Sequence, residues 1–128
     1  MTAPTTTKDV GQSMELAACH YLQQRGLQLI ERNYRTKGGE IDLIMRLGTT
    51  LVFVEVRYRA GIAHGGPTGS IGAEKRRRLL HAATTYLMQF AAQPTCRFDV
   101  VSMSGPRAAP DIHWIEAAFD ATGGHWRP

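Results

Sequence analysis

A Val- and Phe-rich run at residues 50–58, Thr-Leu-Val-Phe-Val-Glu-Val-Arg-Tyr, constrains the fold more than any other segment of the chain. β-Branched and aromatic residues of this kind favour a strand. Because apolar residues occupy consecutive positions before Glu55, both faces of that strand are expected to be covered, as in the centre of a sheet. The run therefore predicts an α/β fold in which residues 50–58 form the central strand.

Two helices are predicted over residues 9–26 and 73–90, where apolar residues recur at three- and four-residue spacing. Asp9 is placed to cap the first helix, and Gly26 is placed to end it. The first helix precedes the strands, and the second follows the central strand. Each is therefore available to cover one face of a sheet.

Four further strands are predicted over residues 27–34, 40–46, 98–103 and 112–117. Short glycine-containing turns join the first three strands of the chain, which favours an antiparallel meander. The helix after the third strand is long enough to cross over, so that the fourth strand can pair with the third in parallel. We expect a mixed sheet in the order helix, three strands, helix, two strands.

A length of 128 residues suits one domain, which we expect at residues 9–120. Residues 1–8 lack the apolar core of a secretory signal and are expected to be a disordered lead-in, and residues 121–128 are expected to be a flexible tail. Residues 61–72 contain five glycines and are expected to form a mobile loop. No apolar stretch approaches the roughly 20 residues that span a bilayer, so we expect a cytoplasmic protein without membrane association.

Acidic side chains interrupt two of the predicted strands. Asp and Glu are depleted from strands and are rarely buried unless they are paired or bind a metal, so Asp42 and Glu55 indicate a site. The short turn at residues 47–49 brings these two acids together across the hairpin, and Glu40 shares a face with Asp42. Glu15 would join them if the first helix packs across the strand ends. Such a group of acids suits a hard divalent cation, Mg²⁺ or Mn²⁺.

Each of these acids also has a structural interpretation. Asp42 and Glu55 could form a buried salt bridge with Arg57 or Arg59 instead of a site, or could do both. Glu40 follows two glycines and could be a solvated turn residue, and Glu15 could be an exposed helix residue.

Positive charge lies close to these acids in the sequence. The net charge is +4 and favours a polyanionic partner, because cations that neutralise phosphates release counterions. A solvated helix face is the alternative for the run at the start of the second helix, although cations there oppose the helix dipole. The residues expected to bind nucleic acid are Arg57, Arg59, Lys75, Arg76, Arg77 and Arg78.

Several motifs together resemble the restriction-endonuclease-like, or PD-(D/E)XK, nuclease superfamily. Within it, the chain resembles the YraN family of small bacterial proteins, which are similar in fold to archaeal Holliday junction resolvases. The motifs that carry the resemblance are Gly11-x-x-x-Glu15-x-x-Ala18, Arg32-Asn33-Tyr34-Arg35, Gly39-Glu40-Ile41-Asp42-Leu43-Ile44, Phe53-Val54-Glu55-Val56-Arg57-Tyr58-Arg59, Lys75-Arg76 and Arg97-Phe98-Asp99-Val100-Val101.

The resemblance implies a restriction-endonuclease-like mixed sheet of five strands and a Mg²⁺-dependent endodeoxyribonuclease activity, with branched DNA as a candidate substrate. It implies Asp42 and Glu55 as metal ligands, the Val56 carbonyl as a backbone ligand and Glu15 as the helix acid. Position 57 would be the catalytic cation. A homodimer is expected, since two symmetric cuts need two sites.

Position 57 departs from the superfamily pattern, which has Lys where this chain has Arg57. Guanidinium stays protonated at any working pH, so Arg57 could hold phosphate but could not act as a base. Lys75 could take over that role from the second helix. A non-catalytic nucleic-acid-binding module that keeps the nuclease fold is therefore the alternative function, although its acids would repel phosphate unless a metal were bound.

Overall fold

A computed structural model of the chain describes residues 6–59 and 72–119. The predicted loop at residues 61–72, except Gly72, and the predicted tail at 121–128 lie outside the described residues, as do residues 1–5 of the predicted lead-in. The helices and strands follow one another as α1 (Thr7–Gln23), β1 (Gln28–Thr36), β2 (Gly39–Leu47), β3 (Thr50–Arg59), α2 (Ala73–Leu87), β4 (Cys96–Ser104) and β5 (Asp111–Phe119).

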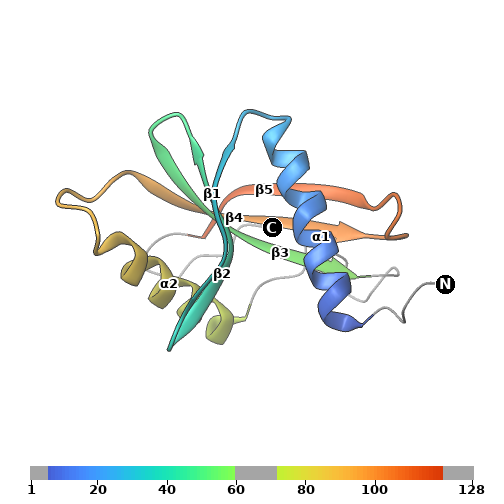
Figure 1. The fold of residues 1–128 in the computed structure, drawn as a ribbon, viewed down its shortest axis with the longest axis horizontal. Coiled ribbons are helices and arrows are strands. Elements are labelled where there is room, and N and C mark those ends of the chain that lie inside the picture. Colours follow the sequence, from blue (N-terminus) through green and yellow to red (C-terminus); the bar gives the residue numbers. More distant parts are fainter. Residues whose placement is uncertain (1–5, 60–71, 120–128) are drawn as a thin grey trace.

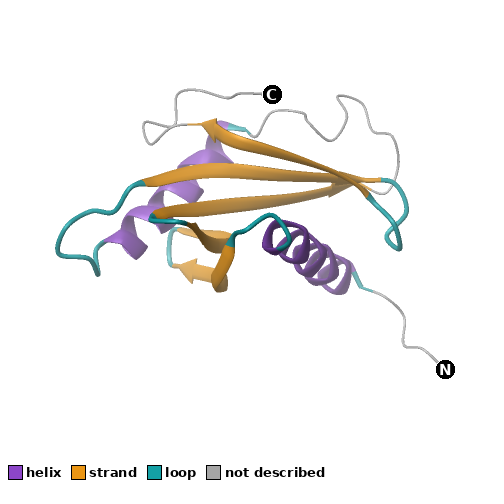
Figure 2. Cartoon of the chain, turned by 90° about the horizontal axis from the view of Figure 1, so that it is seen from above, coloured by secondary structure: helices purple, strands orange, loops and turns teal. Residues whose placement is uncertain are grey.

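The predicted mixed α/β sheet is confirmed. Its strands lie in the order β1-β2-β3-β4-β5, which places β3 at the centre. The first three strands pair antiparallel, β4 pairs with β3 in parallel across the α2 connection, and β5 returns antiparallel to β4. In Figure 2, β3, β4 and β5 run alongside one another, whereas β1 and β2 turn away from them.

Helix α1 begins earlier than predicted, and its cap is Thr6 rather than Asp9. The Thr6 hydroxyl accepts a hydrogen bond from the Asp9 N–H at 3.0 Å, and the Asp9 carboxylate accepts one from the Thr6 N–H at 3.3 Å. This reciprocal pair is a capping box, in which the acid occupies the third helical position. The prediction took the more acidic residue as the cap, although a threonine three residues earlier fits the same motif.

Both helices also end earlier than predicted. Helix α1 ends at Gln23, and Gly26 follows with a φ of 97°, which glycine adopts without steric cost. Helix α2 ends at Leu87 rather than at residue 90, and Tyr86 is its last buried residue. Met88 is accordingly 77% exposed.

The two faces of the sheet carry separate hydrophobic cores. Leu79, Ala83 and Tyr86 of α2 pack on the face that contains Phe53, and Met14 and Leu22 of α1 pack on the opposite face. Alternate residues of β3 thus enter different cores, which confirms that this strand is covered on both sides. Figure 1 shows α1 and α2 on opposite flanks of the curved β1–β2 pair.

One glycine allows α2 to pack directly on β2. A Cβ atom on Gly39 would lie 1.9 Å from the carbonyl oxygen of Arg78, so backbone meets backbone at this point. The contact fixes the basic first turns of α2 beside the start of β2.

Replacing Gly39 with alanine is therefore expected to lower the free energy of unfolding by roughly 3 kcal/mol, because the helix must move off the strand. Gly11→Ala is the matched control, since nothing lies within 4 Å of its added Cβ and alanine is the better helix former. Urea unfolding of the wild type and of the two variants measures the difference. A Gly39→Ala protein as stable as the Gly11→Ala protein would contradict the close contact.

A buried carboxylate fixes the irregular edge between β4 and β5. Asp99 is fully buried and accepts hydrogen bonds from the Arg97 guanidinium, the Trp114 indole N–H at 2.9 Å and the Ala117 N–H at 2.9 Å. Ala117 has a φ of 49°, and the strand register shifts between Phe98 and Val100. Asp99 thus pairs with Arg97, and the same carboxylate holds a β-bulge.

Candidate functional site

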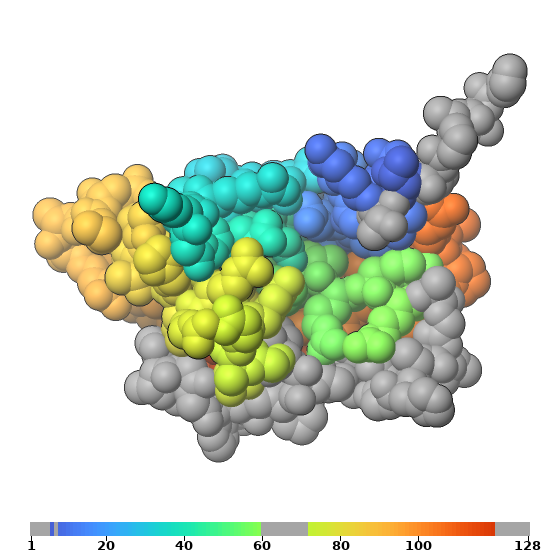
Figure 3. Space-filling model, turned by 90° about the horizontal axis from the view of Figure 1, so that it is seen from below, coloured from blue at the N-terminus to red at the C-terminus, as the bar shows by residue number. Residues whose placement is uncertain are grey.

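Three of the predicted acids line one cavity. Its volume is about 300 Å³, and the acids come from three elements, Glu15 from α1, Asp42 from β2 and Glu55 from β3. Lys75 of α2 and Val56 also line it. Figure 3 shows the surface of β3 exposed between α1 and the start of α2, where these residues lie. The structure therefore brings together the acids that the sequence placed far apart.

Asp42 occupies the point where β2 separates from β3. Ile41 packs in the core beneath α2, whereas Leu43 packs in the core beneath α1, although residues two apart on a regular strand share a face. The β2–β3 pairing ends at Leu43 and Val54, so Asp42 has no ladder partner. Its Oδ2 instead accepts a hydrogen bond from the Val56 N–H at 2.8 Å. The carboxylate thus bridges the gap between the strands.

Glu15 reaches the same point from α1. Its Oε1 lies 4.0 Å from the Arg32 guanidinium and is buried without a hydrogen-bond partner. Asn33, which lies between the Arg32 and Tyr34 pairs of the β1–β2 ladder, has a φ of 53°, and hydrogen bonding to its side chain lowers the pKa of Glu15. Asparagine tolerates this left-handed conformation better than most residues. The Glu15 side chain is only 14% exposed and lines the cavity, so Glu15 is not an exposed helix residue.

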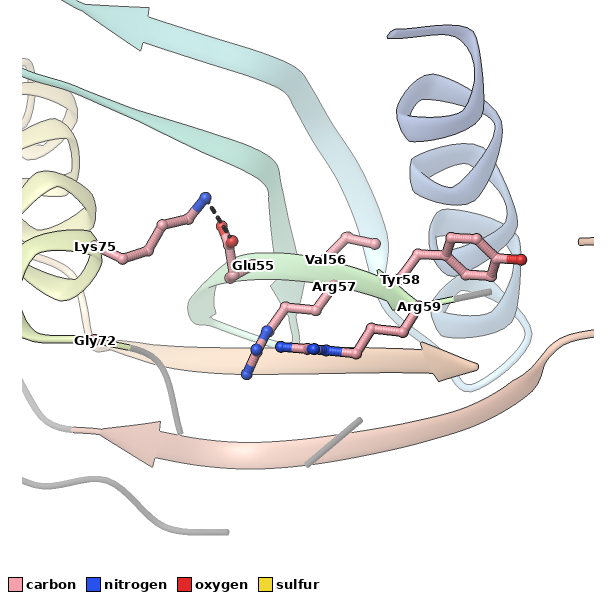
Figure 4. A pocket seen from close by; sticks show the side chains of 7 residues that line it. All are labelled: Glu55, Val56, Arg57, Tyr58, Arg59, Gly72 and Lys75. Carbon is pink, nitrogen blue, oxygen red and sulfur yellow. Dashed lines mark ion pairs between the residues drawn. The ribbon is translucent and has the colours of Figure 1, made fainter. Parts of the chain in front are cut away.

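Glu55 is paired with a lysine from α2. Its side chain is 5% exposed, and its Oε2 lies 2.9 Å from the Lys75 ammonium (Figure 4). Glu55 therefore forms a buried salt bridge, as the structural interpretation expected, but its partner is Lys75 and not Arg57 or Arg59. An ammonium group thus lies in the acidic cavity, although it comes from position 75 and not from position 57.

Burial and mutual repulsion raise the pKa values of two of these acids. Burial raises the pKa of Glu55 to about 8, with a further rise from the Asp42 carboxylate that the Lys75 ammonium only partly offsets. Burial likewise raises the pKa of Glu15 to about 7, and Asp42 adds to that rise. Ionising all three carboxylates therefore costs free energy, which a cation placed among them would offset.

The raised pKa values predict that the metal-free protein loses stability as the pH rises. Both acids bind protons more tightly in the folded chain than in the unfolded chain, where the ordinary value is 4.5. Their contribution is thus fully present below that value and is lost as the pH approaches 8. Thermal unfolding in a chelator between pH 5 and 8.5 should show a falling Tm, and Glu55→Gln should flatten the fall.

Glu74→Gln is the control for this experiment, because Glu74 is an exposed acid on α2 that pairs with Arg77. Its variant should keep the wild-type slope. A Tm that rises from pH 5 to pH 8.5 would contradict the buried, proton-holding state of the cavity acids.

Arg57 and Arg59 lie outside the acidic cavity and line an adjoining one. That cavity has a volume of about 480 Å³ and shares Glu55 and Lys75 with the first. In Figure 4 the guanidinium groups of both arginines lie below the β3 ribbon, whereas the Lys75 ammonium lies above it. Burial lowers the pKa of Arg57, and the neighbouring charge of Arg59 lowers it further. Two like charges held together suit an anion that would neutralise both.

Glu40 does not line the cavity of the other acids. Its carboxylate lies 3.5 Å from the Arg35 guanidinium, and with Arg35 and Arg78 it lines a separate cavity of about 340 Å³. The strand changes face between Ile41 and Leu43, which separates two acids that a regular strand would have placed together. The expectation that Glu40 and Asp42 project to one site is therefore wrong.

The basic run at the start of α2 divides among different surroundings. Lys75 enters the acidic cavity, Arg77 is exposed and pairs with Glu74, and Arg78 faces the cavity of Arg35. Arg76 is half-buried. The run is thus not a uniform solvated face, because two of its four members line cavities.

Sequence reasoning gave no role to Arg32, Asn33 and Tyr58, which also surround the site. Arg32 and Asn33 contact Glu15, and Tyr58 lines both cavities that contain Glu55 while its hydroxyl donates a hydrogen bond to the Gly105 carbonyl at 2.7 Å. The available signal was the polar pair Arg32 and Asn33 in the strand that pairs with the Asp42 strand. It could be linked to the site only once the register between β1 and β2 was known.

The acids of the cavity do not surround an ion position in this structure. Among the residues that the structure describes, no group of three or more His, Cys, Asp or Glu side chains lies in an arrangement that could hold a metal ion. Asp42 and Glu55 each direct an oxygen to an N–H donor, whereas the Glu15 Oε1 is buried without a hydrogen-bond partner. Three converging carboxylates with an unsatisfied oxygen are the donor chemistry that Mg²⁺ and Mn²⁺ prefer.

Together, fold and site define an α/β protein with a five-strand mixed sheet, flanking helices and a cavity of three acids and a lysine. The family described as "Uncharacterised protein family UPF0102" matches residues 14–103. The chain belongs to this family, which confirms the resemblance to YraN proteins at the family level. Within the described ranges, neither helix has the length and apolar character needed to cross a membrane.

Relatives of high identity cover most of the chain. A UPF0102 protein of Polaromonas naphthalenivorans (strain CJ2) is 52% identical over 91% of this chain and 82% of its own length. A UPF0102 protein of Paracidovorax citrulli (strain AAC00-1) is also 52% identical, with 91% and 87% covered. One from Methylibium petroleiphilum (strain ATCC BAA-1232 / LMG 22953 / PM1) is 49% identical, with 91% and 98% covered. The domain is therefore similar in extent to these relatives.

Proposed function

We propose that this protein is a divalent-metal-dependent endonuclease of the PD-(D/E)XK type that cleaves DNA phosphodiesters. The observation that supports the proposal most is the meeting of Glu15, Asp42 and Glu55 with Lys75 at one cavity. A protein that only binds the phosphate backbone gains nothing from three carboxylates beside its cations, since they repel the ligand. The acids are useful there once a divalent cation is bound between them and the phosphate.

Glu15, Asp42 and Glu55 would hold the ion, with the Val56 carbonyl as a backbone ligand. Bound there, Mg²⁺ or Mn²⁺ would stabilise charge on the phosphoryl oxygens and lower the pKa of a bound water. The buried, unpartnered oxygen of Glu15 and the raised pKa values of Glu15 and Glu55 support this assignment. Glu40 is omitted from the ligands because it lines a different cavity.

Lys75 takes the role of the ammonium that the sequence lacks at position 57. Its Nζ already lies in the cavity, so it can donate hydrogen bonds to the phosphate under attack, and it can exchange a proton, which a guanidinium does not do. Arg57 and Arg59 bind the phosphate on the neighbouring nucleotide from the adjoining cavity, where their fork-shaped donors match two oxygens each. Arg76, Arg77 and Arg78 extend this cationic surface along α2.

The proposed substrate is DNA, with branched DNA as the structure to test first, and a homodimer would supply the two sites that symmetric cleavage needs. The test combines calorimetric titration of Mg²⁺ and Mn²⁺ with cleavage of a labelled four-way junction and a plain duplex in the same metal. Metal binding accompanied by metal-dependent cleavage supports the nuclease. Absence of binding at millimolar metal overturns it and leaves the alternative, a module that binds nucleic acid without cutting it.

A further inference from the structure

The Lys75 ammonium lies among the carboxylates that would hold a metal. It is 2.9 Å from Glu55 Oε2, and the Glu55 side chain is almost fully buried. Among the described residues that line the acidic cavity, Lys75 carries the only positive charge. In this structure, the Lys75 ammonium thus supplies the positive charge that balances the carboxylates of the cavity.

The Lys75 side chain contacts the acidic cavity through its ammonium, which pairs with Glu55. The Lys75 side chain is 46% exposed, and its flexible stem starts from the first turn of α2. The ammonium is therefore held by charge and not by close packing, so it can move without disturbing the helix.

We propose that Lys75 is the resident counterion of the acidic cavity and that a divalent cation binds by displacing its ammonium from Glu55 toward the substrate phosphate. This inference rests on the proposed function, because it concerns the same metal site. A divalent cation bound to the buried Glu55 carboxylate would repel an ammonium held 2.9 Å from the same group. Metal binding is therefore expected to weaken the Lys75–Glu55 ion pair.

The first test follows the reactivity of the Lys75 amine in the wild-type protein. The chain has three lysines, Lys8, Lys37 and Lys75, of which Lys8 and Lys37 are exposed and serve as internal controls. Pulse acylation with an amine-reactive ester, read by mass spectrometry, should label Lys75 at least about fivefold faster in saturating Mg²⁺ or Mn²⁺ than in chelator. Equal labelling of Lys75 at metal concentrations that saturate the calorimetric titration would overturn the proposal.

The second test measures metal affinity at pH 8.5 by titration calorimetry on Lys75→Gln. Removal of the competing ammonium should tighten Mg²⁺ and Mn²⁺ binding by about tenfold. Lys37→Gln removes the same charge from the exposed turn between β1 and β2 and should change affinity less than twofold. Lys75→Arg keeps the charge and should bind metal no more tightly than the wild type.

The outcomes separate this inference from the proposed function. Wild-type metal binding that Lys75→Gln leaves equal or weaker would overturn the counterion role and leave the metal-dependent nuclease standing. Absence of metal binding in the wild type and in every variant would overturn both. Metal binding that appears only in Lys75→Gln supports the counterion role and removes metal dependence from the wild-type protein.

Discussion

Replacement of Asp42 by alanine is expected to lower divalent-cation affinity and DNA cleavage each by at least about 100-fold, beyond what the loss of an outer-shell partner costs. Asp42 comes from the strand that opens away from β3, and it lines the same cavity as Glu15 and Glu55. Without it, two of the three acids of the cavity remain. Calorimetry and cleavage of the four-way junction in one buffer measure both effects.

Asp111→Ala is the matched control, because it removes an exposed aspartate at the start of β5, away from the cavity. It should retain wild-type binding and cleavage. Asp42→Asn distinguishes a loss of structure from a loss of charge. The amide oxygen can still accept a hydrogen bond from the Val56 N–H, while the negative charge is removed. Cleavage by Asp42→Ala at the wild-type rate would exclude Asp42 from the reaction. If the wild type does not cleave DNA and Asp42→Ala binds DNA more tightly than the wild type, the non-catalytic alternative is favoured.

Replacement of Asp99 by alanine is expected to lower the free energy of unfolding by roughly 3–5 kcal/mol, the range for breaking a buried charged pair. The change leaves the Arg97 guanidinium, the Trp114 indole N–H and the Ala117 N–H without their acceptor. It also removes the group that holds Ala117 at a positive φ. Urea unfolding monitored by tryptophan fluorescence measures the loss.

The control for this variant is Glu116→Ala. Glu116 also pairs with Arg97, at 3.1 Å, but its side chain is 54% exposed, so its removal should cost less than about 1 kcal/mol. Equal losses in the two variants would show that the stability comes from Arg97 alone and not from the hydrogen bonds to the β-bulge.

The sequence was sufficient for the sheet because the signals for it are local. Residues 50–58 show by composition that both faces are covered, and the short turns around Gly38 and Gly48 fix the antiparallel hairpins. The helix between β3 and β4 then allows only a crossover connection. The helix ends were predicted less accurately, as the cap at Thr6 instead of Asp9 shows. Several residues near a helix end can act as its cap, and the alternatives differ by small free energies.

The site was predicted in part. Asp42 and Glu55 stand out as acids in apolar strands, so their meeting could be expected. Lys75 could be named as a candidate, but its position beside Glu55 could not be derived from the sequence. That position depends on how α2 packs along β2, where Gly39 contacts the Arg78 carbonyl. The separation of Glu40 from Asp42 was missed for a similar reason, since a strand irregularity has no composition signal of its own.

The hydrogen bond from the Val56 N–H to Asp42 means that one carboxylate serves the architecture as well as the cavity. A relative that lacked the proposed activity would still need Asp42 to close the gap between β2 and β3. Glu15 is not needed for the fold in this way, because its buried oxygen accepts no hydrogen bond from a backbone group. Among such relatives, we therefore expect the acid at position 15 to be replaced more readily than the acid at position 42.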